Sequence, residues 1–309
     1  MRKFIRIAIL FFTPVVLLYG MVEYFVRKVP TNYQIIGDYM ESSASEIEAI
    51  SFGSSQMKGA INPALIDKQT LNIASSSQHH NTDFQILKQT RGRFPALKQV
   101  IFEVSYGHFE IAHNSKYFWK GNVFLEYYDV NILDRRAWLK DRLIYSSNPG
   151  VFSRLLWKHY VTKSSKTNYN KYGFDENYFG GKFKRLQYDS IAISESRIDV
   201  DRRSDLKVFR HNVAYFEEML QYCKTEGLDV IICSPPTYDT FNKVRKQDVL
   251  KRRDSVLNRI KSTYNNVYFL QTETDTDFRV IHFRNENHLN SDGAKVFSAK
   301  LNTIMNSIN

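Results

Sequence analysis

A serine after one apolar run and a histidine near the other end of the chain have the residue types of an acyl-transfer site. Ser55 lies in the turn that follows the apolar residues 47–52, and His288 stands directly before the last amphipathic segment. A serine hydroxyl is a weak nucleophile until an adjacent base takes its proton, and histidine can act as that base. The backbone N–H of Ser55 and donors on neighbouring turns would then stabilise the oxyanion.

Alternating strand and helix patterns predict how the chain positions these two residues. We expect strands at residues 47–52, 70–74, 99–104, 228–233 and 266–270, and helices at 82–89, 208–225, 246–264 and 291–307. This alternation predicts an α/β fold with a parallel sheet covered on both faces. Ligands bind such sheets at the carboxyl ends of the strands, so the serine-rich turns after the first two strands should lie on one rim.

Residues 108–204 break this pattern, because they contain many aromatic and basic residues and few clear strands. We interpret them as an insertion in a domain of residues 47–309, forming a cap or a groove wall. Trp119 and Trp157 lie in this insertion and could stack on sugar rings.

The amino terminus predicts a membrane anchor. Residues 4–26 are apolar, and about 20 such residues span a bilayer. A cleaved signal peptide is the alternative, but a small-residue cleavage site is missing. We therefore assign residues 1–29 to a transmembrane anchor and residues 30–46 to a stalk. The cations before the span predict a cytoplasmic amino terminus and an extracytoplasmic domain, periplasmic or at the cell surface.

Composition excludes several classes of protein. The chain has 309 residues, of which 43% are hydrophobic and 14% aromatic, which excludes intrinsic disorder. A single apolar span excludes a multi-span transporter. The only two cysteines, Cys223 and Cys233, fall on a helix's apolar face and in a buried strand, so we expect core thiols and no disulfide scaffold.

Four sequence motifs resemble the SGNH (GDSL-like) hydrolase superfamily, and most closely its membrane-anchored forms that act in O-acyl transfer on cell-envelope polymers. The motifs are SFGSSQ, NIASSS, IICSPP and NHLNSDGAKVFS, within residues 47–107 and 205–307. The resemblance implies a flavodoxin-like three-layer α/β/α sandwich with a parallel sheet.

The resemblance also implies roles for individual residues. Ser55 matches the nucleophile and His288 the general base, while Asn285 stands where the family has an aspartate. An amide can orient an imidazole but supplies no charge, and Glu286 or Asp292 could assist instead. The glycine of the family's second motif falls near Ser76 or Ser77, so Ser55 and Ser77 are the candidate oxyanion donors. The family's third-motif asparagine is missing, because Glu103-Val104-Ser105 follows the third strand.

Other charged and histidine-containing stretches have simpler interpretations. No third ligand lies at a metal spacing from His79 and His80, so we expect loop residues lining the rim and no metal site. The excess of basic residues gives a formal net charge of +11. Beside a membrane anchor, basic runs are typical of a solvated face or of attraction to anionic lipid headgroups or an anionic glycan. Nucleic acid is not expected as a partner.

The sequence thus favours an extracytoplasmic serine esterase or O-acyltransferase acting on cell-envelope polysaccharide or glycan, without metal or organic cofactor. A membrane-bound acyl-donor protein is a possible partner. The sequence does not separate hydrolase from transferase. The alternative is a catalytically inactive protein of the same fold that binds glycan or an assembly partner, and a structural membrane protein explains the motifs least well.

Overall fold

The computed structural model describes residues 1–164, 167–198, 200 and 204–308. At its centre is a five-stranded parallel sheet with the strand order β2-β1-β3-β4-β5. The strands are β1 (Ala49–Ser51), β2 (Thr70–Asn72), β3 (Gln99–Glu103), β4 (Asp229–Ser234) and β5 (Val267–Gln271). The chain passes from β1 to β2 on one side and then to β3 on the other. The topological switch point therefore lies at β1 and β3, where a parallel α/β sheet opens a crevice.

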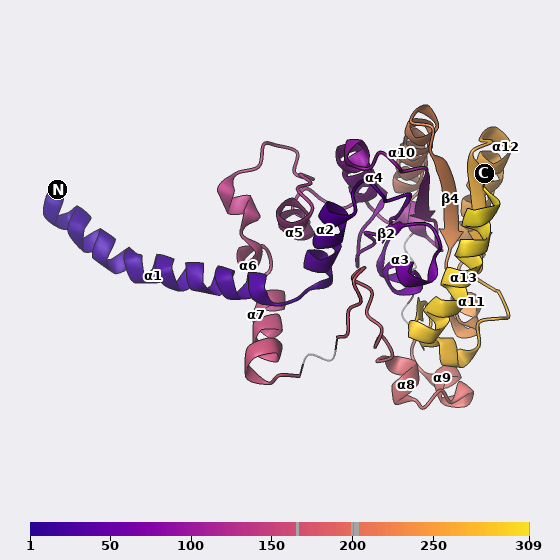
Figure 1. Ribbon diagram of the computed structural model, residues 1–309. Helices are drawn as coiled ribbons and strands as arrows, with labels where there is room; N and C mark the ends of the chain where they lie inside the picture. Colours follow the sequence, from indigo (N-terminus) through magenta and orange to yellow (C-terminus); the bar gives the residue numbers. More distant parts are fainter. Residues whose placement is uncertain (165–166, 199, 201–203, 309) are drawn as a thin grey trace.

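Both faces of the sheet are buried, as expected for parallel strands. Ile50, Val100 and Ile232 belong to the core on one face, together with side chains of the helices α4 (His80–Thr90), α10 (Leu206–Thr225) and α12 (Gln247–Thr263). Ile101 and Ile231 belong to the core on the other face, which α3 (Ser55–Ala60) and α13 (Ser291–Ser307) cover. The result is a three-layer α/β/α sandwich (Figure 1).

Shorter elements complete the sandwich. β6 (Phe283–Asn285) and β7 (His288–Leu289) form an antiparallel hairpin outside the main sheet. The others are α11 (Asp239–Val244) and the 3₁₀ turns η1 (Pro63–Leu65), η2 (Arg91–Arg93), η3 (His108–Glu110) and η6 (Val280–His282).

The α/β prediction is confirmed. Each of the five expected strands is present: β1, β2 and β3 are shorter than predicted, and β4 and β5 are shifted by one residue. The expected helix at residues 291–307 has these bounds. The amphipathic pattern of residues 208–225 is buried as predicted, with Val213, Phe216, Leu220 and Cys223 on the core side of α10. The hairpin β6–β7 is missed by sequence reasoning, because its strands are too short to show an alternation.

The amino-terminal region contains two helices. α1 (Arg2–Lys28) is the one helix in the described residues that is long and apolar enough to cross a membrane. It extends away from the sandwich and is contacted only near its carboxyl end (Figure 1). Length and composition support an anchor, and a signal sequence passes the same test.

The predicted stalk at residues 30–46 is wrong for most of its length. Asn32–Ser42 form the helix α2, which packs into the main core through Ile36 and Met40. The physical reason is helical spacing of apolar residues, which lets α2 bury one face against the domain. α1 is therefore joined to the domain by a packed helix and a short turn.

In the middle of the chain, residues 108–204, the described residues form short helices. They are α5 (Lys120–Tyr127), η4 (Leu139–Arg142), α6 (Ile144–Ser147), α7 (Pro149–Leu156), the π-helical turn η5 (Trp157–Val161), α8 (Lys182–Arg185) and α9 (Ser190–Glu195). α6 and α7 contact the end of α1, whereas Phe183 of α8 and Ile193 of α9 pack with the α13 face of the sandwich. Some of the predicted insertion, residues 165–166, 199 and 201–203, lies outside the described residues.

Candidate active site

Ser55 is positioned by the turn between β1 and α3. It is the first residue of α3, and the Ser54 side chain caps this helix by accepting a hydrogen bond from the Gln56 N–H. Gly53 has a φ of +129°, and a Cβ there would lie 2.8 Å from the Glu103 carboxylate. Only glycine fits this position without strain. The tight turn places the Ser55 hydroxyl at the carboxyl edge of the sheet.

His288 and Asn285 come from the β6–β7 hairpin and meet Ser55 across 233 residues of sequence. Ser55 Oγ lies 2.8 Å from His288 Nε2. On the other side of the ring, His288 Nδ1 lies 3.0 Å from Asn285 Oδ1. An amide oxygen only accepts, so Nδ1 carries the proton and Nε2 is free to accept the serine proton. Ser55, His288 and Asn285 thus form a continuous Ser–His–Asn relay.

The residues after His288 hold the hairpin against α13. The Asn290 side chain caps α13 by accepting hydrogen bonds of 3.0 Å from the N–H groups of Asp292 and Gly293. A Cβ at Gly293 would collide with the His282 carbonyl. The capping asparagine and the glycine therefore let the last helix begin directly beside the relay histidine.

The pKa of His288 is lowered to about 4, first by burial and then by the nearby charge of Arg284. The imidazole is therefore neutral near pH 7 and can accept a proton. Asn285 adds no negative charge that would raise this pKa or stabilise an imidazolium.

Glu286 and Asp292 do not take the place of the missing aspartate. Glu286 is paired with Lys182, and Asp292 accepts a hydrogen bond from Lys295. Within the described residues, neither carboxylate contacts His288. The orienting partner is therefore the amide of Asn285.

Glu103, at the end of β3, stabilises the turn between β1 and α3 that contains Ser54. Its carboxylate accepts hydrogen bonds from the Ser54 N–H at 2.6 Å, from Ser54 Oγ at 3.1 Å and from Ser105 Oγ at 2.8 Å. Burial raises the pKa of Glu103, and these hydrogen bonds partly offset the effect. The third strand thus ends in a carboxyl group that fixes the backbone before Ser55.

The oxyanion donors remain predictions. The N–H of Ser55 is in the first turn of α3, where backbone N–H groups have no partner within the helix. Ser77 lies in the turn between β2 and α4 with a φ of 60°, and its carbonyl accepts a hydrogen bond from Asn114. No contact joins Ser77 to Ser55 within the described residues.

Two lysines lie near the turns at this edge of the sheet, Lys58 half-buried and Lys120 buried, and sequence reasoning missed both. Lys58 lies one helical turn after Ser55, and burial lowers its pKa to about 8. Lys120 of α5 donates hydrogen bonds to Ser75 Oγ and to the Ser76 carbonyl, and burial lowers its pKa to about 7. The spacing of Lys58 from Ser55 on α3 was a usable signal, whereas nothing in the sequence connects Lys120 to the second turn.

The prediction that His79 and His80 are rim-lining loop residues is wrong. His79 caps α4 and His80 is its first residue, and both are buried. His108 joins them, so that one ligand nitrogen from each of the three lies within 4.8 Å of the others. The third histidine comes from the turn after β3, and tertiary structure rather than spacing brings it there.

These three histidines are the candidate metal ligands of the described residues, but their hydrogen bonds leave few free electron pairs. His79 Nδ1 accepts the His80 N–H, and His79 Nε2 lies 2.9 Å from the His108 carbonyl. His80 Nε2 lies 2.9 Å from the Glu103 carbonyl, so only His80 Nδ1 and His108 remain available. The rings of His80 and His108 are stacked, with centroids 4.2 Å apart. A metal ligand donates in the ring plane, so a zinc site would require these rings to turn.

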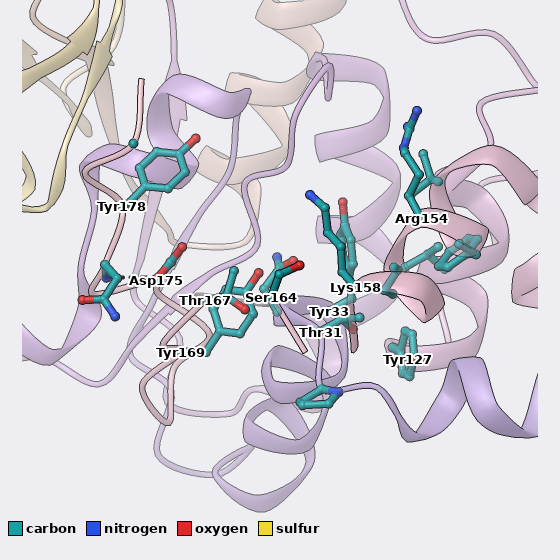
Figure 2. A pocket seen from close by; sticks show the side chains of 18 of the residues that line it. Thr31, Tyr33, Tyr127, Arg154, Lys158, Ser164, Thr167, Tyr169, Asp175 and Tyr178 are labelled. Carbon is teal, nitrogen blue, oxygen red and sulfur yellow. Dashed lines mark hydrogen bonds between the residues drawn. The ribbon is translucent and has the colours of Figure 1, made fainter. Parts of the chain in front are cut away.

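A cavity of about 700 Å³ lies between the middle segment and the α1–α2 junction. Figure 2 shows Tyr178 and Asp175 on one side, Arg154 on the other, and Lys158 and Tyr33 between them. Neither Ser55 nor His288 lines the cavity, but its inner wall contains Tyr178 and Arg284.

Two contacts connect this inner wall to the relay. The Tyr178 ring lies against Gly59, one turn after Ser55 on α3, where an added Cβ would be 3.0 Å from the ring. The Arg284 guanidinium lies 3.5 Å from the centre of the same ring, and it directly precedes Asn285. Trp119 lines the cavity, whereas Trp157 is exposed on η5.

Cys223 and Cys233 are free and buried, which confirms the prediction of core thiols. Burial raises the pKa of Cys223 to about 12 and raises that of Cys233 as well. Neither thiol is a nucleophile near neutral pH.

No protein-family model and no curated protein matches the sequence. Among solved structures, the chain is similar to one of the G-D-S-L family from Desulfitobacterium hafniense, described as lipolytic, at 10% identity and a TM-score of 0.41; the match covers 84% of this chain and 99% of that one. A GDSL-like lipase from Bacteroides thetaiotaomicron is similar at 8% identity and a TM-score of 0.42, covering 90% and 100%. A protein of Bacteroides fragilis described as an acylhydrolase is similar at 9% identity and a TM-score of 0.41, covering 87% and 94%.

The assignment of function rests on the hydrogen bonds of Ser55, His288 and Asn285. Their arrangement can activate a serine hydroxyl for attack on an acyl carbonyl.

Proposed function

We propose that this chain is an SGNH-type serine esterase or O-acyltransferase. The observation that supports it is the relay in which His288 accepts from Ser55 at 2.8 Å and is oriented by Asn285 at 3.0 Å. A nucleophile bonded to a base that is itself oriented by a third group is the arrangement of nucleophilic acyl transfer.

The proposed reaction begins when Ser55 Oγ attacks the ester carbonyl and its proton passes to His288 Nε2. The tetrahedral intermediate collapses as the ester C–O bond breaks, and the leaving alcohol takes the proton from His288. The acyl group then remains on Ser55 as an ester. Water or an acceptor hydroxyl attacks this ester with His288 again as base, which regenerates Ser55 and releases an acid or a new ester.

The amide of Asn285 affects the rate that we expect for this reaction. It keeps the ring in the tautomer that accepts from Ser55, but it leaves the imidazolium formed during attack without a neighbouring anion. We therefore expect a slower enzyme than one with an aspartate at this position. Glu103 contributes by holding the turn, and it does not touch the reacting atoms.

We infer that the substrate is an ester on cell-envelope polysaccharide or glycan, with the domain outside the cytoplasm. The length and apolar composition of α1 support the membrane location. Trp119, Tyr169 and Tyr178 along the cavity support binding of a ring-containing ligand, since aromatic faces suit the C–H surfaces of sugars. A membrane-bound protein that donates the acyl group remains a proposed partner.

Intact-mass spectrometry of the full chain after exposure to a fluorophosphonate probe tests the proposed nucleophile. We expect one adduct on the wild type, none on Ser55→Ala and a much slower one on His288→Ala. Ser194→Ala is the matched control, because it removes an exposed serine hydroxyl that has no contact with the relay in the described residues. A folded wild type that forms no adduct would instead favour a catalytically inactive glycan- or partner-binding protein.

A further inference from the structure

Exposed apolar and aromatic side chains lie on η4 and η5, the two turns that contact the end of α1. We call them the collar: Trp138 and Leu139 beside η4, and Trp157, Tyr160 and Val161 on η5. Leu139 is 83% exposed, Trp138 63% and Trp157 59%. Exposed side chains of this size on two turns that contact the same helix end mark an interaction surface.

Contacts with α1 fix the position of the collar along the anchor. The Tyr160 ring packs edge-on against Phe25, and its hydroxyl donates to the Phe25 carbonyl at 3.2 Å. Near η4, the Arg27 side chain donates to the Arg142 carbonyl at 2.7 Å. Figure 1 shows the neighbouring helices α6 and α7 beside this end of α1. The collar therefore lies at the level of the last turn or two of the anchor.

The length of α1 places that level at a membrane surface. Its 27 residues span about 40 Å, and the hydrocarbon core of a bilayer is about 30 Å thick. The surplus equals roughly the last two turns, in which Glu23 and Val26 are buried against the domain. Exposed tryptophan and tyrosine side chains at this depth are typical of the headgroup region.

The cavity opens on the same side. Its outer wall is formed by Pro30 and Thr31, directly after α1, and by Phe152, Arg154 and Lys158 around α7. Its inner wall, at Tyr178 and Arg284, lies beside the hairpin that contains His288. The cavity thus leads from the membrane-proximal level toward the relay.

The charges in this cavity favour an anion. Arg154, Lys158 and Arg284 line it, and Asp175 is the acidic residue among the lining side chains. Within the part of the chain that the structure describes, Arg154 and Lys158 have no acidic partner. Val151, Phe152 and Leu155 supply an apolar wall beside these cations. Cations next to an apolar wall match an amphiphile with an anionic headgroup.

We propose that the cavity binds a lipid-anchored substrate with a phosphate-bearing headgroup, which enters sideways from the bilayer surface at the collar. This rests on the proposed function and on α1 crossing the membrane, and it names the substrate class of the same site. Trp157 then contacts lipid, and Trp119 is the tryptophan that contacts the bound molecule.

The first test measures the depth of the collar. The full chain with Trp119→Phe and Trp138→Phe keeps Trp157 as its sole tryptophan, and it is reconstituted in bilayers containing lipids brominated at different depths. We expect the strongest quenching of Trp157 by bromines near the headgroup. Quenching by no lipid would overturn the membrane position of the collar.

The second test measures entry into the cavity, with Ser55→Ala in the background so that chemistry plays no part. With Trp138→Phe and Trp157→Phe, Trp119 reports on the cavity in phosphatidylcholine nanodiscs containing brominated phosphatidylglycerol or brominated phosphatidylcholine. We expect preferential quenching by phosphatidylglycerol. Replacing Arg154 and Lys158 by glutamine should weaken it about tenfold or more, since each cation near a membrane surface favours an anionic lipid.

Lys224→Gln with Lys261→Gln is the matched control, because it removes the same charge from exposed positions of α10 and α12. Equal quenching by both lipids, or equal loss in the control, would overturn the proposal. Displacement by soluble glycerol phosphate at the same bulk concentration would assign the cavity to a free phosphate and also overturn it. If probe labelling of Ser55 fails while lipid-selective quenching persists, the proposed function is wrong and the lipid site stands.

Discussion

Two groups of histidines lie at the carboxyl edge of the same sheet, and they differ in what their nitrogens contact. His288 is bonded at one nitrogen to a serine hydroxyl and at the other to an amide oxygen. The rings of His79 and His80 are hydrogen-bonded to backbone atoms, and the ring of His108 stacks on that of His80. Burial lowers the pKa of all four. A shifted pKa therefore does not distinguish a catalytic histidine from a structural one, whereas its partners do.

The largest expected effect is on chemistry at His288. His288→Ala should slow fluorophosphonate labelling of Ser55 by about 10⁴-fold or more, because the hydroxyl loses its base. Labelling rates followed by intact mass provide the measurement. His80→Phe is the matched control, since it also removes an imidazole, keeps a ring beside Phe216 and should leave the labelling rate of folded protein within a few-fold. Equal losses in both variants would show that the two groups do not differ in role.

The three buried histidines should instead determine how much the free energy of unfolding falls in acid. Their pKa values in the folded state lie below the ordinary value near 6.5, so the unfolded state binds more protons and stability falls as pH drops below about 6.5. We expect a loss of about 1 kcal/mol per histidine between pH 6.5 and 5.5. Urea unfolding at several pH values measures this loss. In His80→Phe, this loss of stability between pH 6.5 and 5.5 should be smaller by the contribution of one histidine. An unchanged pH dependence would contradict this explanation.

Glu103 touches both regions, since its carboxylate holds Ser54 and lies 3.9 Å from His108 Nδ1. Glu103→Ala should lower the free energy of unfolding by about 2 kcal/mol and slow labelling about tenfold, because the buried Ser54 N–H loses its acceptor. Glu103→Gln retains an acceptor oxygen and should recover most of the labelling rate. Failure of this conservative variant to recover would show that the charge matters more than the hydrogen bonds.

A carboxylate in place of Asn285 should increase the difference between His288 and the three buried histidines. Asn285→Asp places a negative charge beside Nδ1, which raises the pKa of His288 from about 4 and stabilises the imidazolium. We expect labelling at pH 8 to rise about tenfold, and the acid limb of the pH–rate profile to move to higher pH. Asn287→Asp adds the same charge outside the relay and is the control. A similar shift in both variants would indicate a general electrostatic effect.

The smallest expected effect concerns metal. Zn²⁺ should leave the thermal unfolding midpoint unchanged, because both nitrogens of His79 and one of His80 are already hydrogen-bonded and the rings of His80 and His108 are stacked. Differential scanning fluorimetry with and without Zn²⁺ measures this. A stabilisation by several degrees that disappears in His80→Phe would establish a metal site at the buried histidines.

Several features could be predicted from local sequence because local forces determine them. The apolar runs of β1, β3 and β4 and the one-sided pattern of α10 are periodic, so they indicate their own burial. The turn at Ser55 and the capped start of the helix after His288 are also determined by residues that are neighbours in the sequence. The stalk prediction is wrong because it rests on the polar run at residues 41–45, whereas the apolar side chains before that run recur at helical spacing.

Residue types and short spacings were enough to predict the α/β class, the apolar segment of α1 and the pair Ser55 and His288. Three other features follow from packing: Asn285 rather than Glu286 or Asp292 orients the ring, Glu103 holds the turn before Ser55, and His108 joins His79 and His80. These contacts link residues far apart in the chain or depend on which way a short hairpin turns. Local periodicity carries no information about them, because packing between distant elements sets them.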